Sequence, residues 1–265
     1  MRVRPRFVSV LTLGALSVIL SLPAHAGQTA YEGFTPSFPV YANGGDGFSG
    51  PWAQGGFNAF ASGYIPNDRS LCYPQLQTSG GSVSGAAFPT INGAIRGLEA
   101  PLGANNTTAY LSFLIQPHGT LNSGAFNGFF GVTLNGSLAN DLFIGKPGAG
   151  AEEQYVIETR GGSGQLPSGI PTVVGRTALL VVNAHFLAGN DAFTLYTNPT
   201  PGRPEPVSGI MKTDLDLGNV FKIGIYSTGF FTVDEIRIGT TYADVVPTID
   251  RTLPNQSRGC LEDPR

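Results

Sequence analysis

Charge, sulfur and tryptophan are all scarce in this chain. Of its 265 residues only 12% are Asp, Glu, Lys or Arg, and there are three His, two Cys, two Met and one Trp. No cluster of Cys and His forms an ordinary zinc site, and no glycine-rich string carries the Lys-Ser/Thr of a phosphate-binding loop. After residue 26 the Lys and Arg residues stand singly. Nucleic acids and anionic membranes require clustered basic residues, so we expect neither as a partner.

The one long apolar run, residues 7–22, stands at the N-terminus. It spans about 16 residues, fewer than the roughly 20 that a membrane-spanning helix needs. A membrane anchor is the alternative to a secretory signal peptide, which has a positive segment before the run and small residues after it. The residues that match are Arg2, Arg4, Arg6, Ala24 and Ala26. We expect residues 1–26 to be a cleaved signal peptide, the mature chain to have no membrane span, and the protein to be exported to a periplasm, the cell surface or the medium.

Behind this segment the chain is acidic and rich in turn-forming residues. The 15 basic residues less the three signal arginines leave 12 against 18 acidic residues, a net charge of −6. There are 37 Gly and 20 Pro, yet 41% of the residues are hydrophobic. This composition suits one large β domain with many turns and ample core. We place that domain at residues 27–247 and a polar C-terminal tail at residues 248–265.

Strand patterns recur through the domain. Apolar residues alternate in segments bounded by turn-forming residues, as in half-buried strands: 108–116, 126–134, 142–145, 155–158, 221–226 and 230–238. Residues 178–184 form a nearly continuous apolar run, which is typical of a strand covered on both faces, and residues 190–198 are its expected hairpin partner. A short helix is expected before Pro247. About ten to thirteen short strands without a fixed repeat predict two packed antiparallel sheets.

Four segments occur in an order that resembles a known superfamily. They are Tyr110-Leu111-Ser112-Phe113-Leu114, Phe143-Ile144-Gly145-Lys146, the stretch from Asp191 to Pro201 with Glu205-Pro206, and Asp234-Glu235-Ile236-Arg237-Ile238-Gly239-Thr240. Together with residues 31–34 and Trp52 they resemble the concanavalin A-like lectin/glucanase superfamily, in its bacterial branch related to laminin G-like domains. The resemblance implies an all-β jelly-roll β-sandwich of two antiparallel sheets. That superfamily includes lectins, calcium-dependent adhesion modules and glycoside hydrolases, so the resemblance does not select one function.

Carboxylates are the groups that a hydrolase of this superfamily would need. A retaining glycosidase uses two carboxyl groups about 5 Å apart. Resemblance to the superfamily's hydrolases would imply a Glu-x-Asp-x-x-Glu string or a near variant, which this sequence lacks. Asp234 and Glu235 are adjacent, and adjacent residues of a regular strand point to opposite faces. We therefore expect no catalytic residues and no enzyme activity.

A β-bulge would change the geometry of that acid pair. The apolar residues before the pair and those after it have opposite strand parity, which indicates a bulge between them. An acid turned by a bulge can face a ligand or a cation, so Asp234 and Glu235 are candidate ligand-binding residues. The alternative is a structural ion pair in which Arg237 or Arg96 neutralises a partly buried carboxylate.

Aromatic side chains beside polar groups commonly form the platform of a sugar site. Trp52 and Tyr64 lie on expected loops and are the candidates for such a platform, while a core or anchoring role is the alternative. Calcium binds several oxygen ligands, and Asn190 and Asp191 in a turn are the candidate ligands. Ordinary solvated turn residues explain these two equally well. No cofactor is certain from the sequence, and Ca²⁺ is the one ion with candidate ligands.

Cys72 and Cys260 are the candidate pair for a disulfide, because an even number of cysteines in an exported protein suggests one. Two free thiols are the alternative. With the resemblance, the sequence predicts a secreted, non-catalytic binding module that takes a glycan or surface polysaccharide. The alternatives are a structural component of a surface or matrix and a diverged glycoside hydrolase or lyase.

Overall fold

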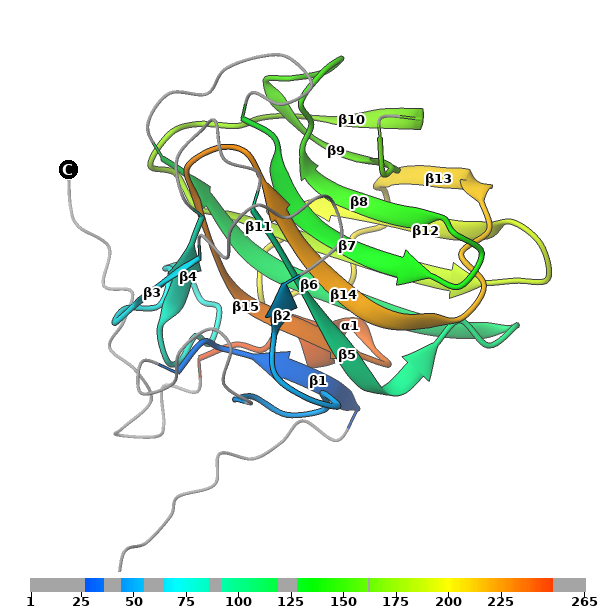
Figure 1. Cartoon of the computed structure of the whole chain (residues 1–265), viewed down its shortest axis with the longest axis horizontal. Coiled ribbons are helices and arrows are strands. Elements are labelled where there is room, and N and C mark those ends of the chain that lie inside the picture. The colour runs from blue at the N-terminus through cyan, green and yellow to red at the C-terminus, as the bar shows by residue number, and fades with distance from the viewer. Residues whose placement is uncertain are drawn as a thin grey trace, which may run out of the picture.

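The structure, a computed structural model, describes residues 27–35, 44–54, 64–85, 92–118, 128–161 and 163–249. Their strands form two antiparallel sheets with one short helix, so the predicted all-β sandwich is confirmed (Figure 1). The expected signal peptide, residues 1–26, and the tail from residue 250 onward lie outside the described residues, and both stay predictions. Within the described ranges no helix is long and apolar enough to cross a membrane.

Each of the two sheets is named after one of its interior strands. The β15 sheet runs β13 (Ile210–Leu215), β12 (Asp191–Thr197), β11 (Ala178–Phe186), β6 (Thr107–Pro117), β15 (Phe231–Gly239), β4 (Ser82–Ser84) and β3 (Ile65–Asn67), and β1 (Gln28–Glu32) also pairs with β15. The β14 sheet runs β10 (Ser163–Pro171), β9 (Gln154–Thr159), β8 (Asp141–Lys146), β7 (Phe130–Gly136), β14 (Val220–Ser227), β5 (Asn92–Leu102) and β2 (Ala53–Gln54).

The main hydrophobic core lies between the two sheets. Alternate residues of each strand point into it, as the period of two requires; Phe113 of β6 and Val132 of β7 belong to this one buried cluster. A second buried cluster, which includes Leu179 and Val181 of β11, lies on the outer face of the β15 sheet. Helix α1 (Tyr242–Val245) contributes to the second cluster. The β15 sheet is therefore covered on both faces, which explains the continuous apolar run in β11.

Strand β15 lies between β6 and β4, and all nine of its residues are buried. Its register against β6 shifts between Asp234 and Arg237, and Glu235 has a φ of 55°. The bulge expected from the parity of the apolar residues is therefore present. After the strand, Thr241 and Asp244 form a capping box at the start of α1, the short helix expected here.

Strand β10 is not predicted by the pattern of the sequence. Its nine residues include two Gly and two Pro, and all are exposed or half-buried. It is an edge strand, where proline is tolerated because one row of backbone groups faces away from the ladder. Its register against β9 shifts at both ends of the Leu166–Pro167 pairing. Pairing with a regular neighbour, and not its own composition, makes this segment a strand.

Candidate functional site

Trp52 and Tyr64 lie in the core and not on the surface. Trp52 is 2% exposed, its ring lies 6.1 Å from that of Phe34, and its Nε1 donates to Glu32 Oε2 at 3.0 Å. Tyr64 is 5% exposed, and its hydroxyl donates to the carbonyl oxygen of Ile225 at 2.9 Å. Neither ring presents a face to a sugar. Their burial gives no support to the prediction that they form a binding platform, because both rings pack in the core and their polar atoms already have hydrogen-bond partners.

A buried ion pair lies next to Trp52, between the sheets. Glu32 of β1 binds the guanidinium of Arg96 of β5, and its other oxygen accepts the backbone N–H of Phe34 at 2.9 Å. Arg96 also donates to the carbonyl oxygen of Gly50 at 2.8 Å. Arg96 is therefore not the partner of the acid pair in β15. This ion pair joins the two sheets and has no exposed face.

The bulge in β15 brings the carboxylates of Asp234 and Glu235 to the same hydroxyl group. Ser70 Oγ lies 2.5 Å from Asp234 Oδ2 and 3.4 Å from Glu235 Oε1. Asp234 also accepts the backbone N–H of Leu71 at 2.7 Å, and Glu235 accepts that of Ser79 at 2.5 Å. The acid pair thus holds the connection between β3 and β4 against the sheet at two points.

Burial and mutual repulsion shift the titration of this acid pair. Burial raises the pKa of Asp234 well above its usual range, and the charge of Glu235 raises it further. Burial also raises the pKa of Glu235, although the positive charge of Arg237 acts in the opposite direction. Arg237 forms an ion pair with Glu235, so the structural alternative considered for these acids is present. Both carboxylates are closed off from solvent, and their positions give no support to a ligand-binding role.

Both carboxylate oxygens of Asp191 already accept hydrogen bonds from backbone N–H groups. Its Oδ1 accepts the N–H of Leu187 at 3.0 Å and its Oδ2 accepts the N–H of Leu217 at 2.9 Å. Asn190 beside it is exposed. Among the described residues no group of three or more His, Cys, Asp or Glu side chains is placed to hold a metal. The prediction of calcium at Asn190 and Asp191 is therefore not supported, because both oxygens of the carboxylate already have partners.

Cys72 is exposed and lies in the connection between β3 and β4. Cys260 lies outside the described residues, so the disulfide between the two stays a prediction. The connection that carries Cys72 is already joined to the end of the domain, because the N–H of Gln77 donates to the carbonyl oxygen of Pro247 at 2.9 Å. The start of the tail therefore lies beside the cysteine-bearing connection.

The outer face of the β14 sheet carries a second set of carboxylates. Glu158 of β9 pairs with Phe143 of β8, so Asp141 stands diagonally from it on the same face. Asp141 forms an ion pair with Arg160 at 2.8 Å. Glu158 accepts a hydrogen bond from Gln165 Nε2 at 2.6 Å, and burial raises the pKa of this carboxyl. One face thus holds an acid paired with arginine and an acid whose pKa is raised by burial.

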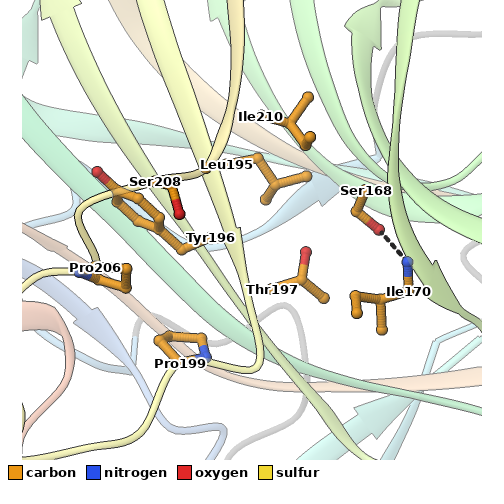
Figure 2. A pocket seen from close by; sticks show the side chains of 10 residues that line it. Ser168, Ile170, Leu195, Tyr196, Thr197, Pro199, Pro206, Ser208 and Ile210 are labelled. Atoms are coloured by element: carbon orange, nitrogen blue, oxygen red, sulfur yellow. Dashed lines mark hydrogen bonds between the residues drawn. The ribbon is translucent and has the colours of Figure 1, made fainter.

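A cavity of about 360 Å³ lies where the edges of the two sheets meet (Figure 2). Strand β10 of one sheet and strands β12 and β13 of the other lie on the same side of the molecule (Figure 1), where Lys212 of β13 donates to the carbonyl oxygen of Gly164 at 2.9 Å. Residues 199–209, the proline loop, complete the wall. The lining residues are Ser168, Ile170, Leu195, Tyr196, Thr197, Pro199, Pro206, Ser208, Gly209 and Ile210.

The lining combines hydroxyl groups with aliphatic surface. The hydroxyl of Thr197 is shielded from solvent and has no hydrogen-bond partner in the part of the chain that the structure describes. Ser168 Oγ accepts the N–H of Ile170 at 3.1 Å and keeps its own proton to donate (Figure 2). None of the ten lining residues is Asp, Glu, His, Lys or Arg. The pocket can therefore bind hydroxyl-rich molecules but has no group that transfers a proton near neutral pH.

Two more buried hydroxyls without a partner among the described residues lie at this end of the sandwich. They belong to Tyr155 and Thr172. Thr172 directly follows β10, and Tyr155 is next to Gln154, which pairs with Pro171 at the end of that strand. Unpaired polar groups are uncommon in protein interiors, and both residues are close in the sheet to the end of β10, the strand whose Ser168 and Ile170 line the pocket.

No local pattern in the sequence marks the pocket residues as a site. The one signal in the sequence is the proline loop, which interrupts the strand pattern between β12 and β13. The hydroxyl-bearing residues come from strands that are distant in sequence, and small polar residues such as Ser168 have no spacing that marks them in advance. The pocket is a product of how the two sheet edges meet.

No protein-family model and no curated protein sequence matches the chain. Solved structures are similar to it in fold. The globular domain of T. cruzi calreticulin is 10% identical with a TM-score of 0.49, covering 83% of this chain and 90% of that one. An endo-1,3-β-glucanase from Streptomyces sioyaensis is 8% identical with a TM-score of 0.47, covering 82% and 98%. A carbohydrate-binding module from Bacillus subtilis is 10% identical with a TM-score of 0.40, covering 67% and 96%. At such identities the similarity concerns the fold alone, and the laminin G-like branch stays a prediction.

Proposed function

We propose that the protein is an exported, non-catalytic carbohydrate-binding module that holds a sugar in the pocket between β10 and the proline loop. The observation that carries the proposal is the hydroxyl of Thr197, which is buried in the pocket wall without a partner among the described residues. A buried hydroxyl left unpaired costs free energy. A ligand hydroxyl that enters the pocket supplies the missing hydrogen bond.

The rest of the lining also suits a sugar. A sugar ring carries hydroxyl groups around its edge and C–H groups on its faces, so it needs polar partners next to apolar surface. Ser168 and Ser208 supply further hydroxyls, and Ile170, Leu195 and Ile210 supply aliphatic surface. Ligand pockets commonly measure about 300–1,000 Å³, and a cavity of about 360 Å³ is at the small end of that range. It suits the end of a glycan better than the middle of a long chain.

The test is a glycan array followed by calorimetry on the glycans that are retained. We expect Thr197→Val, which keeps the side-chain shape and removes the hydroxyl, to weaken binding by about threefold to tenfold, because one neutral hydrogen bond contributes about 0.5–1.5 kcal/mol. Thr213→Val, at an exposed position of β13, is the matched control and should bind as the unmodified protein does. If no glycan is retained with or without a chelator, or if Thr197→Val binds normally, the proposal is wrong.

A second candidate function is an inverting glycoside hydrolase that works on the outer face of the β14 sheet. The observation that favours it is Glu158, whose raised pKa suits a general acid. Inverting enzymes separate their two carboxyl groups by about 6.5–9.5 Å, and diagonal sheet positions are about 7–8 Å apart, which is the relation of Glu158 to Asp141. Against this candidate, Asp141 is already bound by Arg160.

Release of reducing ends from polysaccharides decides between the two candidates. If the hydrolase candidate is right, Glu158→Gln lowers the rate on the order of a hundredfold or more, because it removes the general acid. Glu99→Gln, at an exposed position of β5, should leave the rate unchanged. Absence of activity in the unmodified protein across neutral, acidic and amino polysaccharides would end this candidate.

A further inference from the structure

The proline loop forms the part of the pocket wall that belongs to no strand. It contributes Pro199, Pro206, Ser208 and Gly209 to the lining. Most of its residues are exposed, so little buried apolar surface holds it in place. Its prolines restrict the backbone, but a restricted loop still needs contacts that set its position relative to the sheet.

Glu205, in the middle of the loop, makes those contacts. Its Oε1 accepts hydrogen bonds from the hydroxyl of Tyr196 and from Asn183 Nδ2, both at 2.8 Å. Its Oε2 accepts one from the hydroxyl of Tyr110 at 2.8 Å. The three donors come from β12, β11 and β6, which are adjacent in the β15 sheet. Hydrogen bonds to an ionised carboxylate are about twice as strong as neutral ones, so one side chain ties the loop to three strands.

The tyrosine donors are themselves held in place by helix α1. The ring of Tyr242 lies edge-on to those of Tyr110 and Tyr196, with 6.3 Å between ring centroids in each case. Burial and the carboxylate of Glu205 raise the pKa of Tyr110 to about 12. The same causes raise the pKa of Tyr196. Both hydroxyls therefore stay protonated and donate throughout the physiological pH range.

The start of the loop has separate anchors. The N–H of Leu179 donates to Asn198 Oδ1 at 3.0 Å, and the hydroxyl of Tyr73 donates to the carbonyl oxygen of Pro199 at 3.2 Å. Within the described residues, the side-chain hydrogen bonds that join the middle of the loop to the sheet all end on Glu205. The stretch from Pro206 to Gly209, which lines the pocket, directly follows it.

We propose that Glu205 is the positioning residue of the pocket: it fastens the proline loop to the outer face of the β15 sheet and so sets the wall against which the ligand binds. This inference rests on the proposed function only for the identity of the ligand, which is taken to be a glycan. A loop that is already fixed spares the ligand the entropy of ordering it. Without the carboxylate, the segment from Pro206 to Gly209 moves away from β10, and binding must first bring it back.

The experiment compares Glu205→Ala and Glu205→Gln with Glu99→Ala, an exposed glutamate on β5 that serves as control. Amide hydrogen exchange of residues 202–210 reports the loop without any ligand, and calorimetry with the glycan found on the array reports the pocket. We expect Glu205→Ala to speed exchange in this segment and to weaken affinity on the order of tenfold, with no rise in exchange over the rest of the domain. Glu205→Gln, which keeps one acceptor oxygen, should restore part of both effects. Glu99→Ala should change neither.

Two results would overturn the inference. Unchanged exchange at residues 202–210 in Glu205→Ala would show that other contacts fix the loop. Faster exchange with unchanged affinity would show that the loop does not position the ligand. If the unmodified protein binds no glycan, the proposed function fails, and the exchange measurement still decides whether Glu205 holds the loop. A fall in melting temperature with exchange raised over the whole domain would also contradict a local positioning role.

Discussion

Replacing Asp234 by Asn tests the buried acid pair, because it removes one charge and almost nothing of the shape. The carboxylate of Asp234 accepts three hydrogen bonds, from Ser70 Oγ at 2.5 Å, from the N–H of Leu71 at 2.7 Å and from the N–H of Glu235 at 2.7 Å. A protonated carboxyl can still accept at both oxygens, but the NH₂ group of Asn cannot. One backbone donor is left unpaired in either amide orientation, which costs about 1–3 kcal/mol.

The pH dependence of that loss follows from the direction of the pKa shifts. The folded-state pKa of Asp234 is raised above its unfolded value, which is about 3.9. Between these two pKa values the folded state binds more protons than the unfolded state, so the free energy of unfolding falls as the pH rises. This contribution is fully present below about pH 3.9 and is lost as the pH rises through the folded-state pKa. The Asn variant lacks this contribution. The difference in the free energy of unfolding between the variant and the unmodified protein is therefore largest near pH 4 and decreases toward pH 8.

Urea unfolding, followed by the fluorescence of the single tryptophan, Trp52, measures the free energy of unfolding at a series of pH values. Near pH 4 we expect Asp234→Asn to unfold with about 1–3 kcal/mol less free energy than the unmodified protein. Asp68→Asn, at an exposed position, should give a curve parallel to that of the unmodified protein. Parallel curves for Asp234→Asn and the unmodified protein, or a difference between them that grows from pH 4 to pH 7, would refute the reasoning.

Two other substitutions test the structural roles assigned above. Arg96→Met leaves Glu32 buried without its cationic partner and should lower the free energy of unfolding by about 3–5 kcal/mol, measured by urea titration; a loss below 1 kcal/mol would contradict the buried ion pair. Asp191→Ala leaves the N–H groups of Leu187 and Leu217 unpaired and should cost about 2 kcal/mol or more. Calcium and chelator should each leave the melting temperature of the unmodified protein unchanged, and a calcium-dependent rise would reinstate the metal site.

The sandwich could be predicted because its strands carry local signals. The alternation in residues 108–116 and the continuous run at 178–184 became β6 and β11, and the change of parity around Asp234 located a bulge that the structure contains. These features depend on residues close in sequence. Strand β10 had no such signal, because an edge strand with proline and glycine owes its conformation to the neighbour it pairs with.

The candidate site could not be predicted in the same way. Trp52 and Tyr64 are aromatic residues of the kind that can stack on a sugar, but whether an aromatic residue of a loop faces solvent or core depends on what packs above it. The Nε1 of Trp52 donates to the buried carboxylate of Glu32, and no local pattern in the sequence predicts that hydrogen bond. The pocket depends on the distance between two sheet edges, and Glu205 acquires its role from three strands that the chain reaches 9 to 95 residues away.

The strand order has a consequence for how the chain folds. Strand β15 separates β6 from β4, and strand β14 separates β7 from β5, yet these two interior strands are the last that the described chain supplies. Neither sheet can be assembled in the order in which the chain supplies its strands. Strand β1, the first, pairs with β15, the last. Contacts so distant in sequence make folding slow. Nearly the whole domain must be present before the core closes, and a chain interrupted before residue 220 would contain strands of both sheets without the strand that joins either.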